Sequence, residues 1–122
     1  VCFVRDGKGG CKVASYSLAS GEAKALTPEG ADKVQANFRE AVYLPEVDLM
    51  MIGASGLFYD CGKSAWFKAT LASDAPDIGK HPSYNLGVMY DPGRKLVWAV
   101  DTDSRVFVLK FDAKSANLEA VK

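Results

Sequence analysis

The chain has 122 residues, and its 15 basic and 15 acidic side chains give a formal net charge of zero. A chain of this length folds by default as one compact domain that buries about two thirds of its unfolded surface. The balanced charge gives no support for binding nucleic acid or an anionic membrane, because both need clustered Lys and Arg. The apolar runs reach about five residues, whereas a membrane-spanning helix needs roughly 20.

The chain opens on a strand-like run at residues 1–4 that lacks the basic start and apolar core of a signal peptide. We interpret this as a trimmed or processed N-terminus, which leaves the compartment open. The three cysteines form no Cys-x-x-Cys pair, which disfavours a zinc site, and Cys61 has no evident partner. A turn at Asp6-Gly7 would place Cys2 opposite Cys11, and a disulfide there would indicate an extracytoplasmic or secreted protein. The alternative is two separate thiols in adjacent strands.

Taken in chain order, apolar runs separated by turn-forming residues predict short strands in three groups. The first group is expected at residues 1–6, 12–18 and 23–26. The second is expected at residues 39–43, 49–52, 57–59 and 66–71. The third is expected at residues 84–89, 96–100, 106–111 and 117–121. The connecting segments are residues 27–38, with one helical turn predicted over 31–37, and the polar loop 72–83.

The segment 90–112 has the clearest pattern, which reads turn, strand, turn, strand. Pro92 and Gly93 mark a tight turn, since proline fixes φ and glycine tolerates positive φ. The apolar runs 96–100 and 106–111 do not alternate with polar residues. Both faces of both strands should therefore be covered by other parts of the structure.

Self-comparison shows an internal repeat. Residues 43–52 match residues 90–99 with a constant offset of 47, so that the aromatic residue, the proline and the apolar run fall on their counterparts. Residues 57–60 then match residues 109–112 with an offset of 52. A four-stranded antiparallel sheet that recurs roughly every 45 to 50 residues is typical of a β-propeller blade, whereas a β-sandwich would show alternating strands.

The predicted fold class is all-β, with about 2.75 blades of a β-propeller in this chain. Blade one, which lacks its first strand, covers residues 1–27, blade two covers 38–71 and blade three covers 84–122. Propellers close with about four to eight blades, so the first and last sheets should each expose an apolar face. We expect the ring to be completed by the remaining blades of a larger propeller or by self-association, two chains giving roughly six blades.

Two motifs in the second group resemble the kelch repeats, including the central propeller of galactose oxidase-like proteins. Ile52-Gly53-Ala54 resembles the apolar-Gly-Gly ending of the second strand in that family. Tyr59, followed by Trp66, resembles its tyrosine-then-tryptophan spacing. The third group departs from the pattern, with Val100-Asp101 in place of Gly-Gly and Asn117-Leu118 in place of the tryptophan.

The candidate binding residues are loop side chains that should emerge on one face of a propeller, a placement that rests on the fold alone. They are Asp6, Lys8, His81, Asp101, Asp103 and Arg105. The glycine-rich loop 6–10 lacks the spacing of a phosphate-binding loop, and Asp101 with Asp103 supplies too few oxygen ligands for calcium. The single histidine leaves no nucleophile-base-acid set, so we expect no catalytic residue, metal or cofactor.

Four aromatic residues fit either a carbohydrate-stacking platform or packing between sheets, and their places in strands favour packing. They are Trp66, Trp98, Phe107 and Phe111. The predicted function is a non-catalytic kelch-like segment in protein assembly or ligand recognition, with neither nucleic acid nor membrane as a partner. The alternative is the propeller part of a larger secreted oxidase or glycan-active enzyme whose catalytic residues lie outside this segment.

Overall fold

The computed structural model describes residues 1–5, 11–34, 40–52, 56–69, 86–101, 104–112 and 117–121. Within these ranges the chain is all-β, as predicted, apart from one 3-10 turn, η1 (Ala31–Lys33). The first strands are β1 (Cys2–Arg5), β2 (Cys11–Tyr16) and β3 (Ala23–Leu26). The next are β4 (Ala41–Leu44), β5 (Leu49–Ile52), β6 (Leu57–Asp60) and β7 (Ala65–Lys68). The last are β8 (Leu86–Asp91), β9 (Leu96–Asp101), β10 (Val106–Lys110) and β11 (Glu119–Ala120).

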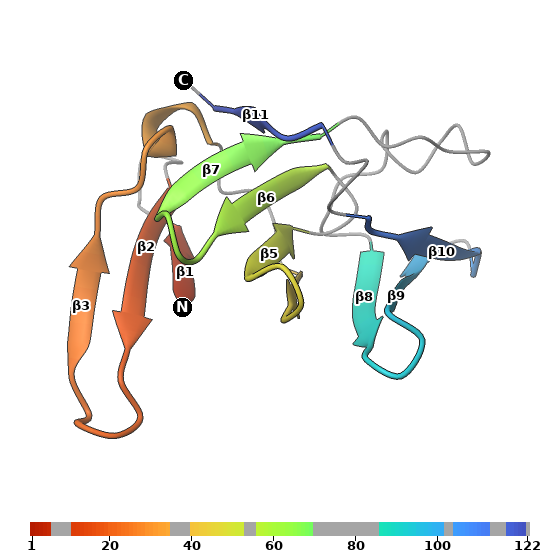
Figure 1. The fold of residues 1–122 in the computed structure, drawn as a ribbon, viewed down its shortest axis with the longest axis horizontal. Helices are drawn as coiled ribbons and strands as arrows, with labels where there is room; N and C mark the ends of the chain where they lie inside the picture. Colours follow the sequence, from red (N-terminus) through yellow and green to blue (C-terminus); the bar gives the residue numbers. More distant parts are fainter. Residues whose placement is uncertain are drawn as a thin grey trace.

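These strands pair antiparallel in three sheets (Figure 1). The first sheet has the order β1-β2-β3, the middle sheet β11-β7-β6-β5-β4, and the third sheet β10-β9-β8. The middle sheet lies between the other two, so the sheets follow one another in space as they do in the chain. The three predicted groups of strands thus correspond to three sheets, except for the last strand of the third group.

Three hairpins whose loops are fully described are closed by four-residue loops, at residues 45–48, 61–64 and 92–95. The last residue of each loop has a positive φ, at 53° for Asp48, 53° for Ser64 and 56° for Lys95. The loops 45–48 and 92–95 are 47 positions apart, the offset of the sequence repeat. The repeat therefore corresponds to an equivalent arrangement of β4-β5-β6 and β8-β9-β10.

Two of these loops are held by an aspartate at the end of the preceding strand. The carboxylate of Asp60 accepts a hydrogen bond from the backbone N–H of Lys63 at 2.8 Å, and that of Asp91 accepts one from Arg94 at 3.0 Å. Each aspartate also forms an ion pair with the same basic residue, at 3.1 and 3.0 Å. These side-chain bonds to the backbone replace the ladder bonds that end at the turn.

Hydrophobic clusters cover both faces of the middle sheet. One cluster joins this sheet to the first sheet, and its buried members are Cys11, Val13, Val34, Ile52, Tyr59, Trp66 and Val121. The other joins it to the third sheet, and its buried members are Val42, Leu44, Leu49, Met51, Phe58 and Val97. Because β5 contributes to both clusters, the predicted two-sided coverage is confirmed for residues 49–52.

An aromatic group forms the centre of the cluster between the first and middle sheets. Tyr59 and Trp66 lie opposite each other on β6 and β7, with ring centres 5.1 Å apart. Phe3 of β1 lies 5.4 Å from each of these two rings. The tyrosine-then-tryptophan spacing of the sequence is thus a cross-strand pair, brought together by the loop 61–64.

The C-terminal strand β11 differs from the prediction, which placed residues 117–121 in the same sheet as β8–β10. It pairs instead with β7 in the middle sheet. Val121 donates its N–H to the carbonyl of Trp66 at 2.9 Å, and only 8% of the residue is exposed. The strand therefore satisfies backbone groups at the outer edge of β7 while burying an apolar side chain beside Trp66.

The segment before η1 contacts the same edge of β7. Glu29 accepts a hydrogen bond from the backbone N–H of Trp66 at 3.1 Å and donates its own N–H to the carbonyl of Ser64 at 3.2 Å. Gly30 follows with a φ of 78° and lies directly against Val121. The helical turn predicted over residues 31–37 is confirmed for its first part, at η1.

The β1–β2 hairpin does not have the register that the disulfide prediction assumed. Arg5 lies opposite Cys11, and Cys2 lies opposite Ala14. The positions of Cys2 and Cys11 are therefore three steps out of register, an odd number that places them on opposite faces of the sheet. The difference arises because Arg5, the last paired residue before the connection, lies opposite Cys11, so the pairing is centred on position 8 and not between positions 6 and 7.

Candidate functional site

The third sheet has one covered face and one open face. Along β9, Val97 and Ala99 are exposed by only 1% and 0%, and Val97 belongs to the cluster shared with the middle sheet. Successive side chains of a strand point to opposite faces, so Leu96, Trp98 and Val100 lie on the other side. On that other side Leu96 and Trp98 are half-buried and Val100 is exposed, so within the described residues the coverage predicted for residues 96–100 is complete on one side only.

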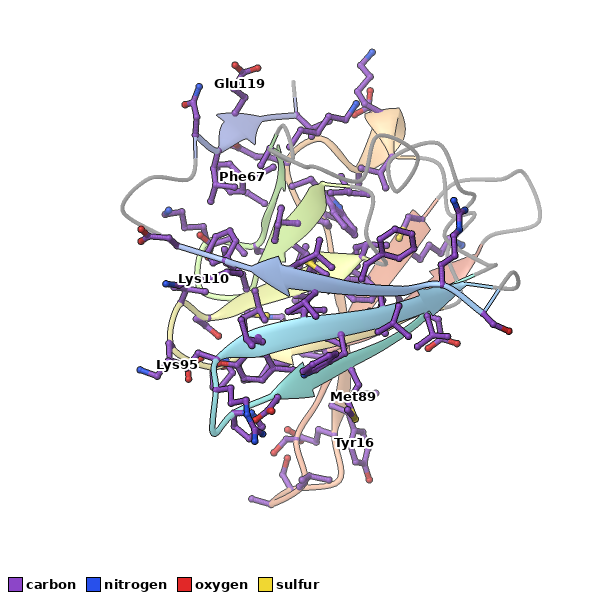
Figure 2. The ribbon with its side chains drawn as sticks, turned by 90° about the vertical axis from the view of Figure 1, so that its right-hand side faces the viewer. Tyr16, Phe67, Met89, Lys95, Lys110 and Glu119 are labelled. Atoms are coloured by element: carbon purple, nitrogen blue, oxygen red, sulfur yellow. The ribbon has the colours of Figure 1, made fainter. Side chains whose placement is uncertain are left out.

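We refer to the open side of this sheet as the β8–β10 face. Its apolar members are Met89, Trp98, Val100, Val106 and Val108. The register places Met89 and Val108 on either side of Trp98, and Val106 next to Val100, so the face is continuous across three strands. In Figure 2 this sheet lies in the foreground, and no other described strand crosses in front of it.

The exposure of these side chains is unusual for a folded domain. Met89 is exposed by 62%, Val106 by 60%, Val108 by 50% and Val100 by 45%. Single exposed apolar residues are common, whereas a continuous exposed apolar patch is uncommon on a monomeric soluble protein. The edge of the sheet is open as well, because β10 is the terminal strand in the order β10-β9-β8 and no described strand pairs with its second edge.

Charged side chains border the β8–β10 face at its loop end. Asp91 and Arg94 form an ion pair at 3.0 Å, and hydrogen bonds and charge from Arg94 hold the pKa of Asp91 below its ordinary value. Lys95 and Lys110 lie at the same end of the sheet (Figure 2). An apolar centre with charges at its border is the usual composition of a protein–protein interface.

The covered side of the third sheet is fixed to the middle sheet by a hydrogen bond. Tyr90 of β8 donates its hydroxyl to Oε2 of Glu46, in the loop between β4 and β5, at 2.5 Å. This bond raises the pKa of Tyr90 to about 12 and lowers the pKa of Glu46 from its ordinary 4.5. The bond is strongest with a protonated tyrosine and an ionised glutamate, which is the state of both groups at neutral pH.

The Tyr90–Glu46 bond predicts a pH-dependent contribution to stability. Because the pKa of Glu46 is lowered on folding, its contribution is present above pH 4.5 and is lost as the pH falls through the lowered value. Because the pKa of Tyr90 is raised, its contribution is lost as the pH rises towards about 12. We expect Tyr90→Phe to lower the free energy of unfolding at neutral pH, with a smaller deficit in acid.

Urea unfolding of the unsubstituted chain and of Tyr90→Phe, at neutral pH and at a pH of about 3, measures this difference. Glu46→Gln removes the titrating carboxylate and should show the same loss of pH dependence. A deficit of Tyr90→Phe that stays constant across the acid range would contradict the expectation.

Most of the binding residues predicted from the sequence have no described side chain. Four lie outside the described residues, namely Asp6, Lys8, His81 and Asp103. Asp101 is described as backbone at the end of β9. Arg105 is described, and its guanidinium lies 5.5 Å from the ring centre of Phe107. The gathering of these six residues on one loop face remains a prediction.

The four aromatic residues considered as a sugar-binding platform lie in separate environments. Trp66 is fully buried between the first and middle sheets, and Phe111 lies 5.2 Å from Phe58 between the ring centres. Trp98 lies on the β8–β10 face. Phe107 lies opposite Ala99 on the neighbouring strand, so it is on the other face of this sheet. Packing between sheets is thus confirmed for Trp66 and Phe111.

The sequence predicted an apolar face on the last sheet but not the residues that form it. The period-two alternation of a strand separates Trp98 and Val100 from Val97 and Ala99. Both sets are apolar, so hydrophobicity alone does not show which set faces inwards. The small Ala99 at a fully buried position was the available signal, because close packing of two sheets favours a small residue there.

Within the described ranges, no group of three or more His, Cys, Asp or Glu side chains is arranged to hold a metal ion. No described helix has the length and apolar character needed to cross a membrane. Comparison of the chain with protein-family models finds no match, and comparisons with curated proteins and with solved structures find none either.

Proposed function

We propose that this chain is a non-catalytic, kelch-like β-propeller segment that acts in protein assembly by packing its outer sheets against further sheets. The β8–β10 face is the observation that carries this proposal. It exposes four apolar side chains by 45% to 62% on one side of a three-stranded sheet. Complete burial of a fully exposed side chain of this kind contributes roughly 1.5 to 3 kcal/mol, and these side chains, which are already about half covered, would each contribute about half of that on association.

The arrangement of the sheets supports the same proposal. The middle sheet is covered by neighbouring sheets on both faces, and its repeat partner β8-β9-β10 is covered on one. A further sheet on the β8–β10 face would give the third sheet the surroundings that the middle sheet already has. The proposed blades are those predicted from the sequence, at residues 1–27, 38–71 and 84–122, except that the strand at residues 117–121 belongs to the second blade and not to the third.

Substitution of Val108 by lysine is expected to abolish association of the chain. Val108 lies in the middle of β10 on the open face, so a lysine there places a charge in the proposed interface. Analytical ultracentrifugation at micromolar concentration should show an oligomer for the unsubstituted chain and a folded monomer for Val108→Lys.

Leu18→Lys is the matched control, because Leu18 is exposed by 92% in the turn between β2 and β3, away from the β8–β10 face. This variant should associate as the unsubstituted chain does. A well-folded monomer of the unsubstituted chain under the same conditions would contradict the proposed function.

A further inference from the structure

The first sheet also has an open face, and its composition differs from that of the β8–β10 face. Val13 and Leu26 lie opposite each other and point towards the middle sheet. The residues next to them along β2 and β3 therefore point away from it. We refer to this outward side as the β1–β3 face. Its described members on β2 and β3 are Lys12, Ala14, Tyr16, Ala23 and Ala25.

The two open faces differ in the size of the side chains at their centres. Ala14 lies opposite Ala25, and Tyr16 lies opposite Ala23, so three alanines form a shallow centre beside one exposed tyrosine. Tyr16 is exposed by 54%. The β8–β10 face carries large side chains at its centre, namely Met89, Trp98 and Val108. Sheets pack well when large residues on one face meet small residues on the other.

The direction of stacking in the chain favours a contact between these two different faces. The first sheet packs on one face of the middle sheet, and the third sheet packs on the opposite face. The β1–β3 face is therefore the outer surface at one end of the stack of three sheets, and the β8–β10 face is the outer surface at the other end. A contact between these two faces repeats the order first sheet, middle sheet, third sheet in the second copy. A contact between two β8–β10 faces would reverse that order in the second copy.

We propose that the occupant of the β8–β10 face is the β1–β3 face of a second copy of this chain. This inference rests on the proposed function and adds the identity of the partner surface. Two copies form the contact twice, once in each direction, and the assembly then closes with two-fold symmetry. The closed assembly has six sheets, within the range of about four to eight blades that propellers use.

Charge complementation between two variants tests this pairing. Val108→Lys places a positive charge on the β8–β10 face, and Ala25→Asp places a negative charge on the β1–β3 face. We expect each variant alone to have a dimer dissociation constant at least tenfold weaker than the unsubstituted chain. An equimolar mixture should recover a dimer with one copy of each variant, because one of its contacts is unsubstituted and the other is oppositely charged.

Native mass spectrometry distinguishes the mixed dimer from either homodimer. Ala25→Lys is the control, because its mixed dimer with Val108→Lys places like charges together at one contact and should therefore be weaker than the mixed dimer of Ala25→Asp with Val108→Lys. Circular dichroism and the urea midpoint show whether each variant is folded, and Ala23→Asp is the second variant if Ala25→Asp is not.

The outcomes separate this inference from the proposed function. If Ala25→Asp dimerises normally while Val108→Lys is monomeric, two β8–β10 faces pair with each other, which overturns this inference and retains the proposed function. If the unsubstituted chain forms a series of larger oligomers, the closed two-chain assembly is overturned. A folded monomer of the unsubstituted chain overturns both.

Discussion

Replacement of Gly30 by alanine is expected to lower the free energy of unfolding by about 3 kcal/mol or more. Gly30 has a φ of 78°, a conformation that costs an alanine about 1 to 2 kcal/mol. A Cβ at this position would also overlap the backbone carbonyl of Val121. The added methyl group would therefore displace β11 from the edge of β7. Urea unfolding followed by circular dichroism measures the loss.

Gly21→Ala provides the matched control for this prediction. Gly21 has a similar φ of 73°, but a Cβ there would meet only the hydroxyl of Tyr16, at an ordinary 3.9 Å. We expect this variant to lose about 1 kcal/mol, since only the backbone conformation is strained. The difference between the two variants measures the close approach to Val121. Equal losses would show that β11 does not pack against Gly30.

Replacement of Trp66 by alanine is expected to cost about 3 to 5 kcal/mol, enough to unfold a domain of ordinary stability. Trp66 is 0% exposed, and its ring contacts Tyr59 on the neighbouring strand and Phe3 on the first sheet. Its removal leaves a cavity at the centre of the contact between two sheets. Urea titration followed by tyrosine fluorescence and by far-ultraviolet circular dichroism measures the free energy of unfolding and tests the prediction.

The other tryptophan gives a control with the opposite pattern. Trp98 lies on the β8–β10 face, so Trp98→Ala should cost the folded monomer no more than about 1 to 2 kcal/mol. Trp98→Ala should also weaken association while the monomer stays folded. Trp66→Ala should affect association only because it unfolds the chain. A larger loss of monomer stability for Trp98→Ala than for Trp66→Ala would contradict the assignment of the two faces.

The positions of the strands could largely be predicted from the sequence. Residues 23–26 and 49–52 are strands with the predicted bounds, and most other strands differ by one or two residues at an end. The repeat offset of 47 in the sequence also corresponds to two hairpins with equivalent four-residue loops. Local signals decide these features, because turn residues and apolar runs act over only a few positions.

Register and the partners of distant strands could not be predicted in the same way. The β1–β2 register depends on the length of its loop, which displaced Cys2 from the position opposite Cys11. The partner of β11 depends on an open edge of β7, more than 50 residues earlier in the chain. Neither apolar pattern nor turn chemistry specifies which of several edges a short strand will join.

The candidate surface was predicted in kind but not in detail. An incomplete stack of sheets implied exposed apolar faces at both ends, and the third sheet has such a face. The sequence pattern predicted charged loop residues such as Asp101 and Arg105 as the binding residues, because exposed charged side chains are a common sign of a binding site. Packing against the middle sheet decides which side of β9 is open, and that contact is made by residues far apart in the chain.

The pairing of β11 with β7 has a consequence for how the protein folds during synthesis. Glu29 and Val121 both form backbone hydrogen bonds with Trp66 at the edge of β7. The middle sheet therefore joins residues that are separated by most of the chain. Contacts of such long sequence separation form slowly, because a large loop must close first. On the ribosome the first hairpins can form early and Glu29 can pair with β7, whereas the part of this edge that pairs with β11 must remain open until residue 121 has left the exit tunnel. A chaperone that shields exposed strand edges would therefore act on this chain in the interval between the emergence of β7 and that of β11.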